Sequence, residues 1–156
     1  MKVNLIAVGK IKENFYQEAI SEYKKRLSRF VDLQVVECSE FPPKSQENIE
    51  IELSKNREGK KIIEKAKGFI IATAIDGNLV SSEGLANLFS QKMNEGFSEI
   101  SLIIGGSNGI SDEVLLKADC VISFGKVTFP HQLMRVILIE QIYRAFSIIN
   151  KLPYHK

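Results

Sequence analysis

Apolar residues along this chain form two patterns: short continuous runs, and longer stretches in which they recur every three or four positions. The continuous runs predict buried β-strands at 3–8, 33–37, 69–75, 100–104 and 120–124. The helical spacing predicts helices at 13–30, 45–67, 81–96, 114–118 and 131–150, with Pro130 well placed at the start of the last one. This alternation predicts one α/β domain over residues 1–156, with a parallel sheet covered by helices on both faces.

A glycine loop follows the fourth predicted strand. Residues 100–104 lead directly into Gly-Gly-Ser-Asn-Gly at 105–109, and Ser111 is a good N-cap for the short helix that comes next. Strand, glycine loop and helix form the usual small-molecule site of an open α/β sheet, but glycine also serves any turn that needs a positive φ. The loop is therefore either a ligand site or a plain tight turn.

Three loops are predicted to share one edge of the sheet. They span 74–78, 105–109 and 124–129, and they follow the third, fourth and fifth strands. Ligands of parallel sheets bind outside the carboxyl ends of the strands. The small residues and free backbone groups of these loops suit a flat heteroaromatic group such as adenine.

Common nucleotide and hydrolase motifs are missing. The loop at 105–109 lacks G-x-G-x-x-G spacing and does not follow the first strand, as a dinucleotide site requires. Lys126 is followed by Val127 instead of the Ser or Thr of a P-loop. Ser107 lacks a G-x-S-x-G elbow, and no histidine is predicted beside it, so a hydrolase triad is unsupported.

Composition narrows the class of protein. The hydrophobic fraction of 44% and charged fraction of 26% are ordinary for a soluble globular domain. No apolar run is long enough for a membrane span, and the strand pattern begins at the first residues without a signal peptide, so we expect a cytoplasmic protein with no membrane contact. The two cysteines and two histidines lack zinc-ligand spacing, so no metal site is expected.

Two predicted helices carry basic faces, although the net charge is only +2. The first face consists of Lys24, Lys25, Arg26 and Arg29, and the second of Lys60, Lys61, Lys65 and Lys67. Such runs are either solvated helix faces or phosphate contacts.

The last predicted helix is apolar around most of its circumference. A single contact with a sheet buries only one stripe of a helix, so a second apolar partner is implied. The hypothesis is a homodimer through this helix, which a monomeric elution at micromolar concentration would contradict. The alternative is an ordinary core helix buried on two sides.

Four blocks of the chain closely resemble the ribosomal RNA large-subunit methyltransferase H family. They are LIIGGSNG at 102–109, TFPHQLMR at 128–135, EQIYRA at 140–145 and the ending PYHK at 153–156. This family belongs to the SPOUT class of trefoil-knotted methyltransferases. The resemblance implies a C-terminal trefoil knot, which is an exception to the rule against knots. It also implies a homodimer that uses S-adenosylmethionine to methylate N3 of a pseudouridine in 23S rRNA, within the large subunit or the whole ribosome.

By position, the resemblance implies a cofactor site drawn from the three loops. Its residues are Thr73, Gly105, Phe124, Gly125, Lys126, Val127, Thr128 and Phe129. Leucine is common in the family at Thr73 and lysine at Asn78, and both differences concern one wall of the pocket. The sulfonium of S-adenosylmethionine is already a strong electrophile, so no metal is required.

The resemblance also gives the chain end a role, since the ending of an arbitrary chain would be expected to fray. His155 is the candidate base or proton relay for the N3 proton, because the imidazole pKa lies near physiological pH. Tyr154 would orient or stack on the base, while Arg144 and Lys156 would hold phosphate or the developing oxyanion. Lys156 stands where arginine is common, which replaces a bidentate contact with a point contact. His131 is expected to shape the cofactor loop.

Two other functions compete with an RNA methyltransferase. A non-catalytic RNA- or ribosome-binding module would bind RNA without the cofactor, and an α/β enzyme for a small nucleotide-like substrate would turn over without RNA. The modest net charge predicts weak binding to naked RNA and favours the assembled ribosome as substrate.

Overall fold

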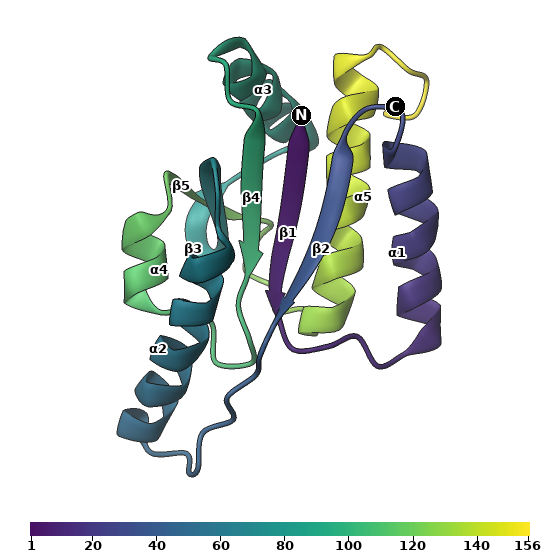
Figure 1. Cartoon of the computed structure of the whole chain (residues 1–156). Coiled ribbons are helices and arrows are strands. Elements are labelled where there is room, and N and C mark those ends of the chain that lie inside the picture. Colours follow the sequence, from purple (N-terminus) through teal and green to yellow (C-terminus); the bar gives the residue numbers. More distant parts are fainter.

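The computed structural model describes residues 1–156 and contains five strands and five helices in strict alternation (Figure 1). The strands are β1 (Lys2–Val8), β2 (Asp32–Cys38), β3 (Phe69–Leu79), β4 (Glu99–Ile104) and β5 (Cys120–Ser123). The helices are α1 (Asn14–Leu27), α2 (Asn48–Lys65), α3 (Ser82–Asn94), α4 (Asp112–Lys117) and α5 (His131–Ile149). The predicted alternation is confirmed, with boundaries that shift by a few residues.

All strands pair in parallel, in the order β2-β1-β4-β3-β5. The central strands β1 and β4 are buried along nearly their whole length, which is why they read as continuous apolar runs. The third, fourth and fifth strands are neighbours, so the loops that follow them share one edge of the sheet, as predicted.

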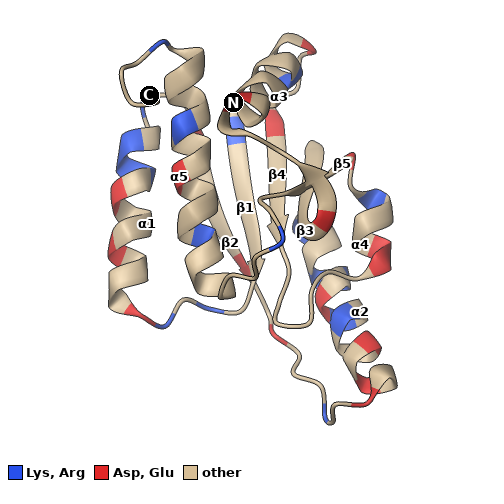
Figure 2. Cartoon of the chain, turned by 180° about the vertical axis from the view of Figure 1, so that it is seen from behind, with Lys and Arg blue, Asp and Glu red and all other residues tan.

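Helices cover both faces of the sheet. Helices α1, α3 and α5 pack on one face, and α2 and α4 pack on the other (Figures 1 and 2). Successive side chains of β1 point to opposite faces, so Leu5 joins the first core and Ile6 the second. The predicted three-layer α/β arrangement is therefore confirmed.

Strand β3 departs from the expected pattern. The Asp-Gly pair at 76–77 was expected to form a turn that ends the strand at 75, but the strand continues to Leu79 with a shift in register. Both Thr73 and Asn78 face Ile122 of β5, so the residues between them bulge outward. A Cβ on Gly77 would lie 2.7 Å from the backbone of Ile122, which explains the glycine there. The bulge places residues 74–77 beside the loop that follows β5.

Serine stands at or just before three of the predicted helix starts, at 45, 81 and 111, and two of these serines cap a helix. The Ser81 hydroxyl accepts a hydrogen bond from the Gly84 N–H at 3.0 Å, and Ser111 caps α4 in the same way. Helix α2 begins three residues after Ser45, whose hydroxyl accepts a hydrogen bond from the Glu47 N–H at 3.3 Å before the helix begins. Ser45 thus closes a turn and does not cap α2.

Helix α5 lies across the sheet between α1 and α3 (Figure 1). Pro130 occupies its N-cap position, and Leu138, Ile139 and Ile142 are fully buried in the core. Much of the apolar circumference is therefore covered within one chain. None of its 19 residues is fully exposed, yet the outer apolar side chains, such as Leu133 and Ile137, are only half-buried. The homodimer through α5 stays a prediction.

Candidate functional site

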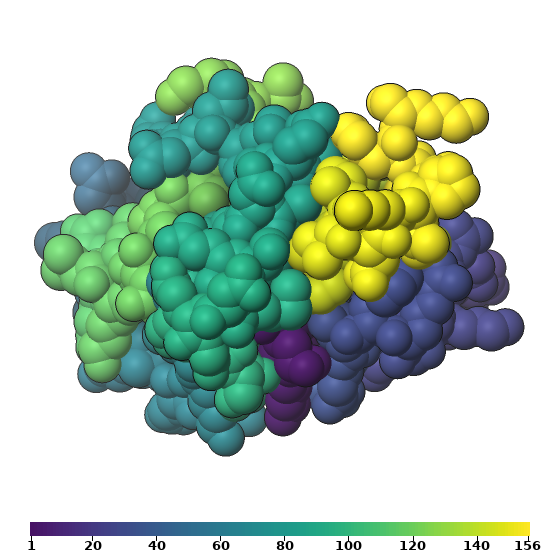
Figure 3. Space-filling model, turned by 90° about the horizontal axis from the view of Figure 1, so that it is seen from above, coloured from purple at the N-terminus to yellow at the C-terminus, as the bar shows by residue number.

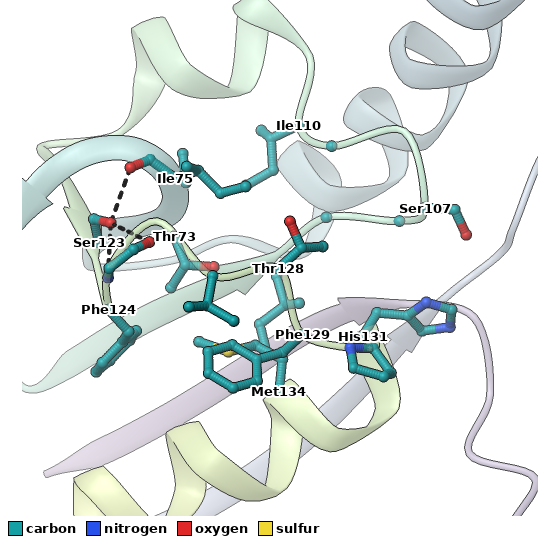
Figure 4. Close-up of a pocket in the computed structure, with 18 of the residues that line it drawn as sticks. Thr73, Ile75, Ser107, Ile110, Ser123, Phe124, Thr128, Phe129, His131 and Met134 are labelled. Carbon is teal, nitrogen blue, oxygen red and sulfur yellow. Dashed lines mark hydrogen bonds between the residues drawn. The ribbon is translucent and has the colours of Figure 1, made fainter.

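A cavity of about 640 Å³ opens at the carboxyl edge of the sheet, where the loops after β3, β4 and β5 meet the start of α5 (Figure 4). Seven of the eight predicted cofactor residues line it: Thr73, Gly105, Phe124, Gly125, Val127, Thr128 and Phe129. The three loops are distant in sequence but line one cavity, because the strands that precede them are neighbours in the sheet.

Lys126 is the predicted cofactor residue that does not line the cavity. Its Nζ lies 3.1 Å from Oδ1 of Asp76, and the two side chains are 80% and 94% exposed. Because water surrounds both charges, this pair contributes little to stability. The side chain of Lys126 therefore points to solvent while its neighbours face the cavity.

Several lining residues lie outside the predicted set. Ile104, Ile110 and Met134 form apolar walls, and His131 stands at the rim where α5 begins, next to the loop that it was expected to shape. Met134 was missed because the helical pattern assigns every apolar residue of α5 to a core or an interface. The signal available was its position, one turn after the loop at 124–129.

Ser123 joins two of the loops. Its hydroxyl donates to the carbonyl of Ile75 at 3.0 Å and accepts from the Gly125 N–H at 3.2 Å (Figure 4). The bulge of β3 and the loop after β5 are thereby held together behind the cavity. Gly125 has a φ of +115°, a conformation that side chains other than glycine rarely adopt.

Thr73 ties the cavity wall to the neighbouring strand. Its Oγ1 donates to the Ile103 carbonyl at 2.8 Å. The hydroxyl proton is thus engaged by the backbone of β4, and toward a ligand the oxygen can act only as an acceptor. Leucine, which is common in the resembled family at this position, lacks this hydrogen bond.

The glycine loop is a tight turn and a cavity wall at the same time. The Gly109 N–H donates to the Gly106 carbonyl at 3.0 Å, which closes the turn. A Cβ on Gly105 would lie 2.7 Å from the backbone of Gly109, so only glycine lets the two segments approach this closely. The tight turn is therefore confirmed, while the role of the loop as a ligand site stays a prediction.

A buried carboxyl group supports this loop from behind. Glu58 of α2 is only 5% exposed, and its Oε1 accepts a hydrogen bond from the Phe41 N–H at 3.1 Å. Its Oε2 lies 2.8 Å from the place that a Cβ on Gly106 would take. Burial raises the pKa of this carboxyl group above its ordinary value, although the Phe41 hydrogen bond opposes the shift.

Arg135 anchors the start of α5 to the end of β1. Its fully buried guanidinium donates to the carbonyls of Val8 at 2.6 Å and Gly9 at 3.0 Å, and its Nη1 lies 3.3 Å from Oε1 of Glu37. Burial lowers the pKa of Arg135 while the carboxylate of Glu37 opposes this shift. Since Met134 precedes this anchor, the anchor fixes one wall of the cavity.

The predicted catalytic residues gather at the opposite end of α5. The guanidinium of Arg144 donates to Glu140, and the Tyr154 hydroxyl donates to the same carboxylate at 3.0 Å. In His155, Nδ1 lies 3.4 Å from Nη1 of Arg144, and Nε2 lies 2.7 Å from Oε1 of Glu83. We call this group of residues, with Lys156, the C-terminal cluster.

Three of the four predicted catalytic residues are thus brought together, while Lys156 is exposed and makes no polar side-chain contact. The two carboxylates, Glu140 and Glu83, are not among the predicted site residues. Glu140 could have been found from its spacing of four residues from Arg144 on a helix. Glu83 gave no such signal, because it lies on a different helix.

The electrostatics of the cluster hold the chain end in place. Burial raises the pKa of Tyr154, and the nearby hydroxyl of Tyr23 and carboxylate of Glu140 raise it further, so the phenol stays protonated. The hydrogen bond to Glu140 raises the pKa of Arg144. The pKa of Glu83 is lowered, first by a hydrogen bond from its own backbone N–H and then by His155. The ending is therefore bound to the domain.

The cavity and the C-terminal cluster do not meet within one chain. Met134 and Arg144 are ten positions apart on the same helix, which is about 15 Å along its axis. The two groups of predicted site residues consequently lie at opposite ends of α5.

Comparison with known proteins places the chain in a family. Residues 1–155 match the family model described as "Predicted SPOUT methyltransferase". The chain belongs to the SPOUT methyltransferase family. A solved structure of a probable methylase family protein from Haemophilus influenzae Rd KW20 is similar, with a TM-score of 0.55 and 15% identity over 99% of this chain and 70% of that chain. At this identity the likeness shows a shared fold.

SPOUT methyltransferases use S-adenosylmethionine, and the cavity of this SPOUT methyltransferase fits such a ligand. Its volume is typical of small-molecule sites, and Ile104, Ile110 and Met134 offer apolar surface to a flat adenine. The glycine-containing loops at 105–109 and 124–129 leave backbone groups accessible for hydrogen bonds.

Other site chemistry is sparse in this SPOUT methyltransferase. No cluster of three or more His, Cys, Asp or Glu side chains is arranged to hold a metal ion. Both cysteines are free thiols, and burial raises the pKa of each. No helix combines the length and the apolar character needed to cross a bilayer.

Substitution Gly105→Ala should weaken S-adenosylmethionine binding. The new Cβ would force the loop apart at Gly109, and overpacking of this kind costs about 1–3 kcal/mol, which is roughly a tenfold to hundredfold loss of affinity. Calorimetric titration with S-adenosylmethionine measures this affinity. Gly84→Ala is the control, because its Cβ would meet no backbone atom and only the side chains of Val80 at 3.3 Å and Ser81 at 3.4 Å. Unchanged affinity in Gly105→Ala would exclude the loop as a wall of the cofactor site.

Substitution Glu58→Gln should raise the unfolding temperature at neutral pH. The folded protein binds the Glu58 proton more tightly than the unfolded chain, so the wild type loses stability as pH rises through the raised pKa. Glutamine has no charge to bury and still accepts from the Phe41 N–H. The unfolding temperatures of the wild type and Glu58→Gln should converge as pH falls below 4.5, the ordinary pKa of a glutamate side chain. The exposed control Glu18→Gln should show no such dependence, and a constant difference for Glu58→Gln would contradict the assignment.

Proposed function

We propose that this SPOUT methyltransferase transfers the methyl group of S-adenosylmethionine to N3 of a pseudouridine in 23S rRNA. The proposed substrate is the large subunit or the whole ribosome, and the proposed active form is a cytoplasmic homodimer with a trefoil-knotted C-terminal segment. The observation that carries the proposal is the ordered chain end, in which Tyr154 and His155 are held by Glu140 and Glu83. An incidental chain end would fray. The ending Pro-Tyr-His-Lys is also one of the blocks that resemble the methyltransferase H family.

S-adenosylmethionine supplies an electrophilic methyl group when bound, so the protein has to align the acceptor nitrogen and remove its proton. The contacts of His155 indicate its tautomer. A guanidinium only donates, so Nδ1 facing Arg144 is the acceptor, and Nε2–H donates to the carboxylate of Glu83. Nδ1 is then the atom that takes the N3 proton, once Arg144 turns toward the substrate. Glu83 would stabilise the resulting imidazolium.

The other members of the cluster fit supporting roles. Tyr154 stays protonated, so its hydroxyl is a donor and not the base, and its ring offers a surface for stacking. Arg144 keeps its charge at all physiological pH values and is suited to the developing oxyanion. Lys156 is exposed and available to a phosphate.

The distance between the cavity and the cluster supports a shared site. In a two-fold dimer with antiparallel α5 helices, the C-terminal cluster of one chain would lie beside the cavity of the other. The half-buried Leu133, Val136 and Ile137 lie near the cavity end of α5 and are suited to such a contact. Each dimer would then hold two composite sites.

The proposal predicts labelling of 23S rRNA at one pseudouridine. Ribosomes that lack the modification, incubated with the protein and S-adenosylmethionine carrying a labelled methyl group, should acquire label, and mass spectrometry should map it to N3. The Gly105→Ala protein is the control and should label weakly at limiting cofactor. If cofactor-bound wild type leaves 23S rRNA unlabelled, the proposal fails, and RNA binding without transfer would favour a non-catalytic ribosome-binding module.

A composite site predicts complementation between two impaired chains. A chain lacking residues 154–156 should bind S-adenosylmethionine normally but transfer no methyl group as a homodimer. Co-expression with the Gly105→Ala chain under a second tag allows the heterodimer to be purified. At limiting cofactor it should reach about half the wild-type rate and exceed both homodimers, because one of its two sites combines an intact cavity with an intact cluster. A site formed within one chain would give a heterodimer no more active than the mean of the two homodimers.

A further inference from the structure

The two basic helix faces, which the sequence alone could not distinguish as RNA-binding candidates, lie on opposite sides of the sheet. Figure 2 shows Lys and Arg gathered at the C-terminal end of α1, beside the C-terminal end of α5 and the chain terminus. Lys60, Lys61 and Lys65 belong to α2, which packs on the opposite face of the sheet. Only the α1 face therefore lies near the C-terminal cluster.

Aromatic rings connect the end of α1 to the cluster. The guanidinium of Arg26 lies 5.6 Å from the ring centre of Tyr23 and 6.0 Å from that of Tyr143. The Arg29 guanidinium donates to the Tyr143 hydroxyl at 3.5 Å, and the Tyr143 ring packs edge-on against Tyr154 at 4.7 Å. Figure 3, which views this end of the molecule, shows the C-terminal segment in direct contact with α1. The exposed basic side chains and the half-buried Tyr23 and Tyr154 thus lie around one buried ring, that of Tyr143.

Most of the charge on this surface is not neutralised. Arg26 pairs with Glu22 at 2.7 Å, but Lys25 and Arg29 are exposed and form no ion pair with a carboxylate. The last turn of α1 contains no acidic residue. On α2, likewise, Lys61 pairs with Glu64 at 2.9 Å, and the exposed Lys60 and Lys65 form no ion pair, so position and not ion pairing distinguishes the two faces.

We propose that Lys25, Arg26 and Arg29 extend the C-terminal cluster into an RNA-binding surface that holds the strand next to the target base. This inference rests on the proposed function. Exposed Lys and Arg attract phosphates, and guanidinium groups lying over aromatic rings are typical surfaces for unpaired bases. The face of α2 makes no contribution to RNA binding.

The chemistry of the surface favours RNA over an acidic protein. An acidic protein would need only the positive charges, whereas this surface joins the charges to the half-buried rings of Tyr23 and Tyr154, which pack on the buried Tyr143. Stacking on aromatic rings is characteristic of single-stranded nucleic acid.

The test compares two double variants that each remove two positive charges. Lys25→Gln with Arg29→Gln alters the proposed surface, and Lys60→Gln with Lys65→Gln alters exposed lysines of α2 as a matched control. Binding to unmethylated large ribosomal subunits and to deproteinised 23S rRNA is measured at several salt concentrations. The α1 variant should bind both RNA targets up to roughly tenfold more weakly than the wild type. The slope of log affinity against log salt concentration should fall by about 1 for each phosphate contact that is lost.

The outcomes separate this inference from the proposed function. The α1 variant should keep the wild-type affinity for S-adenosylmethionine and the wild-type unfolding temperature, and saturating ribosomes should restore its rate. If the wild type labels 23S rRNA and both double variants bind it equally well, the proposed RNA-binding surface on α1 is contradicted while the proposed methyltransferase function is retained. Weaker binding to subunits with unchanged binding to deproteinised RNA would assign the surface to a ribosomal protein and overturn the inference. If wild type labels no RNA, the proposed function itself fails.

Discussion

Burial of β4 between β1 and β3 is the constraint on which the rest of the molecule depends. Its side chains enter the cores on both faces of the sheet, where an unpaired polar group would be costly. Ser101 is a buried polar residue of β4, but it is not unpaired, because its hydroxyl donates to the Lys67 carbonyl at 2.7 Å. Within the sheet, groups that can face a ligand are therefore confined to the ends of the strands, and the glycine loop after β4 lines the cavity there.

Helix α5 connects the cavity at this edge of the sheet to the C-terminal cluster and fixes the distance between them. Its first turn forms part of the cavity, and its fourth turn carries Arg144 and receives the chain end. A packed helix is a rigid spacer, so the two groups stay about 15 Å apart in one chain. The buried Arg135 fixes the register of this spacer against the end of β1. In the proposed homodimer, a second copy of the chain would bring both groups to one substrate.

The same geometry orients the proposed substrate. In the proposed function, RNA at the C-terminal cluster would also meet the end of α1, because Tyr143 and Tyr154 connect the two groups of residues. The cavity, by contrast, is lined mainly by apolar and backbone groups, which suit the cofactor and not a polyanion. The distribution of charge thus separates the two ligands even though they must meet for methyl transfer.

The sequence by itself determined the elements, the parallel sheet and the three loops at one edge, because apolar periodicity and glycine act over neighbouring positions. It also supplied, through resemblance, seven residues that line one cavity. Tertiary structure alone decided that Lys126 points to solvent, that β3 bulges against Ile122, and that His155 meets Glu83. These features depend on contacts between segments far apart in the chain, and no local pattern encodes which distant side chain a residue will face.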